Sequence, residues 1–195
     1  MQQADLIVAV AAYLLGSVPS GLWITRAAGV ADIRRFGSGN PGAANILRSG
    51  RRDLAVLTLL ADSGKAAAAV GLAHALAANA PVAALGAMLG NVASVWLRFR
   101  GGKGVATGFG ATAVLAWPVA LAGALAWLAT AALSRISSAA SLIAAAVVPA
   151  AAALMRQGPE VVWTTLAMSG LIALRHQANI SRLLKGQEPR LGRRP

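Results

Sequence analysis

Long apolar runs constrain this chain more than any other feature of its sequence. They lie near residues 4–25, 54–78, 81–98, 105–133, 139–155 and 160–174. A helix needs about 20 apolar residues to cross a bilayer, or about 17 when it is short. Alternating strands with regular turn signals, as in a membrane barrel, are not found in the sequence. We therefore expect an all-α bundle of membrane helices, which satisfies the backbone within lipid.

The run at 105–133 decides how many spans to expect. It contains Trp117-Pro118, and proline disfavours helix at the residue before it, so the run forms one kinked span or two short ones. Cytoplasmic segments are rich in Lys and Arg. Segment 26–53 and the C-terminal tail, with Arg193 and Arg194, are both basic. Two short spans put both inside, which predicts about seven helices with the N-terminus outside and the C-terminus cytoplasmic. A six-span bundle that breaks the charge trend is the alternative.

Composition supports one integral membrane domain over residues 1–195. Charged residues make up only 12% of the chain, whereas soluble domains average about 25%. The net charge of +12 would suggest nucleic acid in a soluble protein, but here it fits cytoplasmic loops. The absence of cysteine excludes disulfides and thiolate chemistry. The first apolar run lacks a basic segment before it, so we expect a retained span rather than a cleaved signal peptide.

Three polar segments interrupt the apolar sequence, at residues 32–48, 99–104 and 175–188. Each combines cations, small polar side chains and, in the first two, clustered glycines. The predicted orientation puts all three on the cytoplasmic side, where one pocket can use them together. Such groups hold phosphate oxygens, so we expect binding of phosphorylated molecules at the membrane face.

In the first segment, Gly37, Gly39 and Gly42 leave backbone N–H groups bare, and Ser38 and Asn40 add polar donors. Consecutive bare N–H groups form an anion-binding concavity. An ordinary glycine-rich turn is the alternative.

We expect Arg48 at the start of a short helix, where its guanidinium can hold two phosphate oxygens. In the second segment, Gly101, Gly102, Lys103 and Gly104 precede an apolar run. They predict a phosphate cradle at a helix N-terminus. A flexible turn with a topogenic lysine is the alternative.

In the third segment, His176 and Asn179 are three residues apart and share a helix face. Nearby cations lower the pKa of a histidine, so we expect His176 to be neutral. Glu188 is expected to order the segment by pairing with an arginine. A snorkelling amphipathic tail on anionic lipid is the alternative.

Two further groups are interpreted as structural. Asp62 and Lys65, spaced i, i+3 within an apolar run, predict an ion pair. His74 is placed at the membrane interface. The sequence shows no Ser-His-Asp set, carboxylate pair or metal-ligand spacing. From the residues alone, the prediction is a binder of phosphorylated substrates with no obvious strong base.

Four runs, in order, resemble the bacterial acyl-phosphate:glycerol-3-phosphate acyltransferase family. They lie at 16–48, 101–107, 134–142 and 175–188. The resemblance implies a seven-helix enzyme of the bacterial inner membrane whose active site faces the cytoplasm. It implies acyl transfer from acyl phosphate to the 1-hydroxyl of glycerol 3-phosphate, giving lysophosphatidic acid and inorganic phosphate. Membrane lipid is the other expected partner, with no nucleic acid, metal or cofactor.

The resemblance also assigns roles to residues. It implies that the catalytic residues are Ser38, Arg48, Lys103, His176 and Asn179. It implies that substrate phosphate is bound by Gly37, Gly39, Asn40, Gly42, Gly101, Gly102, Gly104 and Ser141. Glu188 is implied as structural support. The chain departs from the usual family pattern at Ala44, Asn91, Ser94 and Arg100.

Two other functions remain open at this point. A transporter of a phosphorylated solute requires polar residues that continue through the bilayer, whereas here they stop at one face apart from Asp62 and Lys65. A non-catalytic binder of anionic lipid would keep its role without Lys103 or His176.

Overall fold

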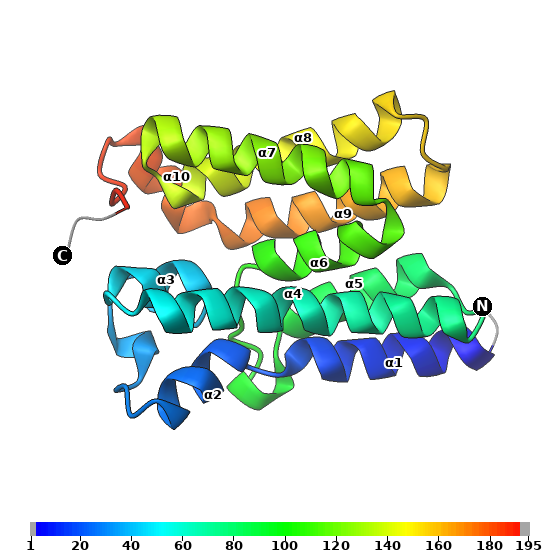
Figure 1. The fold of residues 1–195 in the computed structure, drawn as a ribbon, viewed down its shortest axis with the longest axis horizontal. Coiled ribbons are helices and arrows are strands. Elements are labelled where there is room, and N and C mark those ends of the chain that lie inside the picture. The colour runs from blue at the N-terminus through cyan, green and yellow to red at the C-terminus, as the bar shows by residue number, and fades with distance from the viewer. Residues whose placement is uncertain (1–2, 192–195) are drawn as a thin grey trace.

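A computed structural model describes residues 3–191, and all regular structure in that range is helical. The long apolar helices are α1 Gln3–Ser17, α4 Arg52–Ala75, α5 Ala80–Val92, α6 Val105–Leu115, α7 Trp117–Ser134, α8 Ser137–Leu154 and α9 Pro159–Arg175. The short ones are α2 Ser20–Ala27, η1 Ile33–Arg35, α3 Ala43–Arg48, η2 Val95–Leu97 and α10 Gln177–Leu184. The long helices run along the longest axis of the molecule, with α2, α3 and α10 at the end opposite the start of α1 (Figure 1). Arg193 and Arg194 lie outside the described residues.

Prolines break two of the predicted apolar runs. The run at 105–133 divides at Ala116, and α7 begins with Trp117 followed by Pro118 in its first turn. Proline suits a first turn because its missing N–H would have no helical partner there. The run therefore forms two helices, and whether both cross the membrane stays a prediction. The first run, expected as one span, stays a single candidate span over Gln3–Ala27, but it bends at Val18-Pro19, where α1 gives way to α2.

Length and composition qualify five helical segments to cross a membrane. They are Gln3–Ala27, Arg52–Ala75, Ala80–Leu97, Trp117–Ser134 and Ser137–Leu154. The apolar helix α6 has 11 residues, which span about 16 Å, roughly half of a bilayer core. Helix α9 has 17 residues. The count of seven crossings and the orientation of the termini therefore stay predictions.

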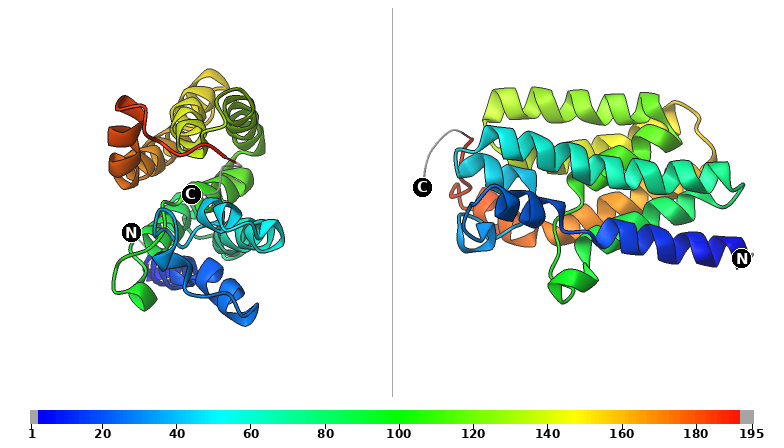
Figure 2. Two further views of the ribbon diagram at one scale, coloured as in Figure 1. Left: turned by 90° about the vertical axis from the view of Figure 1, so that its left-hand side faces the viewer. Right: turned by 60° about the horizontal axis from the view of Figure 1, so that its bottom comes forward.

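The bundle has two groups of helices with α5 and α6 between them. Helices α7, α8, α9 and α10 form one group, and α1, α2 and α4 form the other (Figure 2). Helices α1 and α5 approach closely, since a Cβ on Gly16 would lie 2.1 Å from the carbonyl oxygen of Ala87. A Cβ on Gly90 would meet the carbonyl oxygen of Tyr13 at the same distance, 2.1 Å. Small residues permit such contact between apolar helices.

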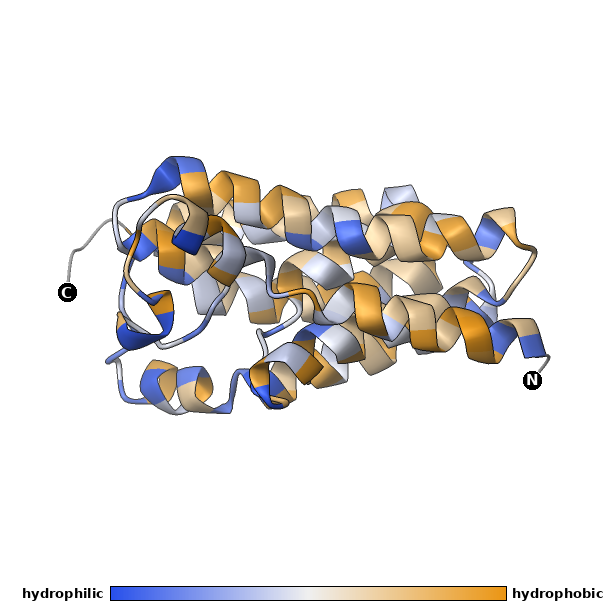
Figure 3. Cartoon of the chain, turned by 90° about the horizontal axis from the view of Figure 1, so that it is seen from below, coloured by the Kyte–Doolittle hydropathy of each residue, from blue (hydrophilic) through white to orange (hydrophobic). Residues whose placement is uncertain are grey.

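Polar and apolar residues separate along the bundle. Hydrophilic residues gather at the end that carries α2, α3 and α10, while the helix bodies are largely apolar (Figure 3). Large apolar side chains such as Ile7, Leu60 and Leu125 are exposed on α1, α4 and α7. A soluble protein rarely exposes apolar faces of this extent. The distribution suits helices that face lipid and one polar end that faces water.

Candidate functional site

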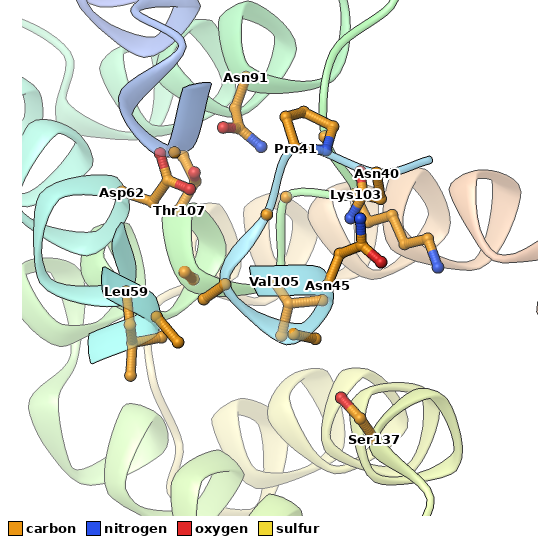
Figure 4. Close-up of a pocket in the computed structure, with 18 of the residues that line it drawn as sticks. Asn40, Pro41, Asn45, Leu59, Asp62, Asn91, Lys103, Val105, Thr107 and Ser137 are labelled. Carbon is orange, nitrogen blue, oxygen red and sulfur yellow. The ribbon is translucent and has the colours of Figure 1, made fainter. Parts of the chain in front are cut away.

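The three polar segments meet in one pocket of about 420 Å³ at the polar end of the bundle. Of the predicted site residues, the pocket is lined by Ser38, Asn40, Gly42, Arg48, Gly102, Lys103, Gly104, Ser141, His176 and Asn179. Gly37, Gly39, Gly101 and Glu188 lie outside this lining. In Figure 4, Asn40, Asn45 and Lys103 gather on one side of the pocket, and Ser137 lies across from them. Residues far apart in the sequence thus form one site, although their individual roles stay predictions.

Asn45 organises the first segment. The residue is 1% exposed, and its Nδ2 donates to the carbonyls of Ile33 and Phe36, both at 3.0 Å. Its Oδ1 accepts from the backbone N–H of Ser38 at 3.0 Å and from the Ser38 hydroxyl at 3.2 Å. Asn45 falls within the first polar segment, at residues 32–48, but the sequence pattern indicated no function for it. One buried amide therefore sets the shape of the loop that presents Ser38.

This geometry changes the expectation of bare N–H groups in the first segment. The N–H of Ser38 donates to Asn45, and the N–H of Gly39 donates to the carbonyl of Phe36 at 3.0 Å. Gly37 has a φ of 55°, and a Cβ there would lie 2.5 Å from Asn45 Oδ1. The glycine at this position is thus required by the turn around Asn45. An anion held by the amides of Ser38 and Gly39 would have to replace these internal bonds.

Arg48 is the last residue of α3, not the first residue of a helix as expected. It lines the pocket, and its Nε is buried without a hydrogen-bond partner among the described residues. Burial lowers the pKa of Arg48, and the charge of Arg182 lowers it further, whereas that of Glu188 raises it. Arginine remains protonated under any physiological condition. A half-buried guanidinium with a free donor is suited to an anionic ligand.

The second segment is fixed from both sides. The N–H of Gly101 donates to the carbonyl of Val92 at 3.1 Å, and that of Gly102 to the carbonyl of Asn91 at 2.8 Å. Arg175 donates through Nη2 to the Gly101 carbonyl at 3.1 Å and through Nε to the Gly102 carbonyl at 3.2 Å. The predicted phosphate cradle therefore lacks free amides at Gly101 and Gly102. Arg175 supports this loop, which sequence reasoning did not assign to it.

Lys103 and Gly104 complete this loop at the start of α6. Gly104 caps the helix with a φ of 80°, a conformation that suits glycine. Lys103 Nζ donates to Asn179 Oδ1 at 2.5 Å, joining the second segment to the third. Burial lowers the pKa of Lys103 to about 8, and nearby arginines, including Arg48, add to that effect, while Glu188 opposes it. Lys103 is therefore a cation at neutral pH whose charge is lost in mildly alkaline solution.

Glu188 closes the third segment. Its Oε1 accepts from Asn179 Nδ2 at 2.5 Å and from the Ser138 hydroxyl at 2.8 Å. Its Oε2 accepts from Arg182 Nε at 2.6 Å, which confirms the expected pairing with an arginine. Burial acts to raise the pKa of Glu188, but the hydrogen bonds from Asn179, Ser138 and Arg182 lower it overall. The carboxylate therefore stays ionised and links α8 to α10.

His176 lies between α9 and α10 and is 2% exposed. Its Nδ1 is 2.8 Å from the carbonyl oxygen of Ile172, which places the proton on Nδ1 and leaves Nε2 as an acceptor. Burial lowers the pKa of His176 to about 4, and Lys103 adds to this shift. The neutral form was predicted from neighbouring cations, but burial is the larger cause. Its imidazole is thus a hydrogen-bonding group and a weak base.

The predicted ion pair within α4 is confirmed. Lys65 Nζ lies 2.7 Å from Asp62 Oδ1, and Asp62 lines the pocket, on the same side as Asn91 and Thr107 (Figure 4). His74, near the other end of α4, is exposed and does not line the pocket. Within residues 3–191, no group of three or more His, Cys, Asp or Glu side chains could hold a metal ion.

Apolar side chains line the remainder of the pocket. Val56 and Leu59 come from α4, Val105 from α6 and Trp127 from α7. Trp127 Nε1 donates to the Ser141 hydroxyl at 3.2 Å. The sequence predicted Ser141 as a site residue but not Trp127, because the sequence of an apolar helix does not show which way a tryptophan side chain points. The site therefore combines a cationic part with an apolar part, as an amphipathic ligand requires.

Comparison with known proteins identifies the class. The sequence profile of the glycerol-3-phosphate acyltransferase family matches residues 6–186. This chain belongs to that family. The glycerol-3-phosphate acyltransferase of Cereibacter sphaeroides is 51% identical over 193 residues, covering 98% of this chain and 91% of the relative. That of Paramagnetospirillum magneticum is 52% identical over 182 residues, covering 92% of this chain and 90% of the relative.

Two solved structures share the fold. The glycerol 3-phosphate form of PlsY, an integral membrane glycerol 3-phosphate acyltransferase, has a TM-score of 0.92 and 33% identity, covering 96% of each chain. The lysophosphatidic acid form has a TM-score of 0.90 and 32% identity, covering 96% of this chain and 95% of PlsY. The protein is therefore an integral membrane protein of the acyltransferase class, as the sequence indicated.

Proposed function

We propose that this protein transfers a fatty acyl group from acyl phosphate to the 1-hydroxyl of glycerol 3-phosphate. The products are lysophosphatidic acid and inorganic phosphate. One observation carries the proposal: Arg48 and Lys103 line a pocket with apolar walls, and no carboxylate within the described residues forms an ion pair with either. Cations placed where charge develops in a transition state often contribute more to catalysis than any other effect. The glycerol 3-phosphate and lysophosphatidic acid forms of PlsY support the same assignment.

The reaction forms one bond and breaks one. The 1-hydroxyl oxygen attacks the acyl carbonyl carbon, and the bond from that carbon to the phosphate oxygen breaks, releasing inorganic phosphate. Arg48 and Lys103 neutralise the charge on the bound and departing phosphates. Asn179 holds Lys103, and Ser38, at the exposed edge of the pocket, can donate to a phosphate oxygen when its hydroxyl turns away from Asn45. Asn40, Gly42, Gly104 and Ser141 line the space that the phosphates occupy.

The hydroxyl proton requires an acceptor, and the side chains at the site are poor candidates. Glu188 already accepts three hydrogen bonds, and Asp62 is paired with Lys65. His176 has a pKa of about 4, because it is buried and lies near Lys103. A general base works best when its pKa lies near the working pH. The phosphate of glycerol 3-phosphate is therefore the proposed acceptor.

The acyl chain is assigned to the apolar side of the pocket, against Val56, Leu59, Val105 and Trp127. We also propose that the protein lies in the bacterial inner membrane as one domain with its active site toward the cytoplasm. Hydrophilic residues gather at the α2, α3 and α10 end (Figure 3), and Arg26, Arg48 and Arg182 lie in these helices. This charge supports the orientation, since cytoplasmic faces are rich in Lys and Arg.

Phosphate release tests the activity. Purified protein in lipid nanodiscs receives acyl phosphate with or without glycerol 3-phosphate, and lysophosphatidic acid is followed by mass spectrometry. We expect phosphate and lysophosphatidic acid in equal amounts, and only when both substrates are present. Arg48→Ala should lower the rate at least about 100-fold, whereas Arg26→Ala, an exposed arginine of α2, should not. Phosphate release that is independent of glycerol 3-phosphate would contradict the proposal.

A further inference from the structure

Lys65 has all of its hydrogen-bonding capacity committed inside the protein. It is 8% exposed near the middle of α4. Its Nζ donates to Asp62 Oδ1 at 2.7 Å, to Asn91 Oδ1 at 2.9 Å and to the carbonyl oxygen of Val18 at 2.9 Å. An ammonium has three donors and no acceptor. Lys65 therefore has no donor left for a substrate, and its partners come from α4, α5 and the bend after α1.

The partner on α5 connects Lys65 to the loop that carries Lys103. The backbone carbonyl of Asn91 accepts from the N–H of Gly102 at 2.8 Å, while its side chain accepts from Lys65. A Cβ on Gly101 would lie 2.1 Å from the same Asn91 carbonyl oxygen. The loop thus rests directly on the end of α5, and Asn91 contacts Lys65 on one side and the loop on the other.

The partner after α1 connects Lys65 to the first polar segment. Val18 lies where α1 bends into α2, and its carbonyl also accepts from the N–H of Ser20 at 2.9 Å. A Cβ on Gly21, the next residue, would lie 2.1 Å from the carbonyl oxygen of Pro41. Pro41 belongs to the loop that presents Ser38 and Asn40. The same ammonium therefore fixes the backbones that support two of the three anion-holding segments.

We propose that Lys65 is a positioning residue that sets the placement of Lys103 through Asn91. The expected effect on the reaction rate rests on the proposed function. The expected effect on the position of Lys103 does not. An ion pair of this kind is a weak source of stability, because burying the two charges offsets their attraction. A positioning role accounts for all three hydrogen bonds that Lys65 donates, to α4, to α5 and to the bend after α1. Neutralising Asp62 would require only the first of them.

The test removes the charges together so that no unpaired charge stays buried. In the double variant Asp62→Asn/Lys65→Met, we expect kcat/KM for glycerol 3-phosphate to fall about 10- to 100-fold, the effect of a misplaced catalytic group. The KM for acyl phosphate should change less than that for glycerol 3-phosphate, because the apolar walls of the pocket, which hold the acyl chain, are untouched. Asn91→Leu, which removes only the acceptor on α5, should act in the same direction. Thr58→Val, a buried α4 residue with an unpartnered hydroxyl outside the pocket, is the matched control and should match wild type.

Chemical labelling of Lys103 gives a readout independent of activity. Amine acetylation over a pH series, with mass spectrometry of the peptide, measures how Lys103 titrates; in wild type its pKa is about 8 because it is buried. We expect the titration to move to higher pH in Asp62→Asn/Lys65→Met and in Asn91→Leu, as the loop loosens and Lys103 becomes hydrated. Thr58→Val should leave it unchanged.

The outcomes separate the two proposals. If Asp62→Asn/Lys65→Met and Asn91→Leu both show wild-type kinetics and wild-type labelling of Lys103, the proposed role of Lys65 is overturned. If the double variant does not fold, Asn91→Leu decides by the same two readouts. If wild type releases no phosphate, the proposed function fails, and the labelling of Lys103 still decides the role of Lys65.

Discussion

Glu188→Gln tests whether one buried carboxylate holds the third segment in place. The glutamate side chain is 1% exposed and accepts from Ser138, Asn179 and Arg182. A glutamine offers one acceptor oxygen and an NH2 group that only donates. Whichever way the amide turns, one of these donors faces another donor. The substitution therefore removes a charge and leaves a buried polar group unsatisfied.

The magnitude follows from these contacts. The Arg182 side chain is 37% exposed and can be hydrated when its partner loses its charge, so the cost comes from the weakened hydrogen bonds and the buried unsatisfied donor, together about 2–4 kcal/mol. For a chain of this length, each kcal/mol lowers Tm by about 2–4 °C, so we expect a decrease of about 4–16 °C. Thermal unfolding in detergent, followed by tryptophan fluorescence, measures it. Glu160→Gln, an exposed glutamate in the first turn of α9, should cost less than about 1 kcal/mol.

The same substitution should alter the charge on Lys103. Glu188 raises the pKa of Lys103 and so opposes the effect of burial. Its loss should move that pKa below about 8, so the alkaline decline in activity begins at a lower pH. A Glu188→Gln protein with a Tm within about 3 °C of wild type and an unchanged pH profile would refute this reasoning.

Other predictions follow from single contacts. Arg48→Lys should raise the KM for glycerol 3-phosphate about 10-fold, measured by phosphate release, because a lysine lacks the bidentate fork; an unchanged KM would contradict this. In wild type, kcat/KM for glycerol 3-phosphate should fall as pH rises through about 8, where Lys103 loses its proton, and a flat profile to pH about 9.5 would argue against a charged Lys103. Leu59→Trp should lower kcat/KM for long-chain relative to short-chain acyl phosphates about tenfold in competition assays, and equal losses would remove Leu59 from the acyl wall. Gly104→Ala should destabilise the protein by about 2 kcal/mol in thermal unfolding, because φ is 80° and a Cβ would meet Met88; a stable variant would contradict that strain.

The sequence predicted the features that depend on local pattern. Apolar runs indicated membrane helices, Pro118 indicated the break between α6 and α7, and the i, i+3 spacing indicated the pair of Asp62 with Lys65. The convergence of three polar segments followed from charge and topology. Each of these needs only short-range spacing or the sign of a loop charge.

The remaining features depend on tertiary partners that spacing does not reveal. The amides of Gly101 and Gly102 bind carbonyls at the end of α5, so they are not the free donors that a glycine-rich loop suggested. Asn45 organises its loop through acceptors 9 and 12 residues away. Burial, not neighbouring charge alone, keeps His176 neutral. Sequence supplied the residue types at the site, but packing determines which of their groups remain available.

The close contact between the backbones of α1 and α5, a seam formed at Gly16 and Gly90, should make the tolerance of substitutions differ from helix to helix. At Gly16 and Gly90 even a single methyl group would collide with the backbone of the facing helix, whereas α7 buries only Val119, Ala120 and Gly123. Gly90 directly precedes Asn91, so a larger residue at position 90 would displace Asn91, which accepts a hydrogen bond from Lys65. Natural variation and laboratory evolution can therefore adapt the outer helices to different lipids, while this inner seam should change very slowly.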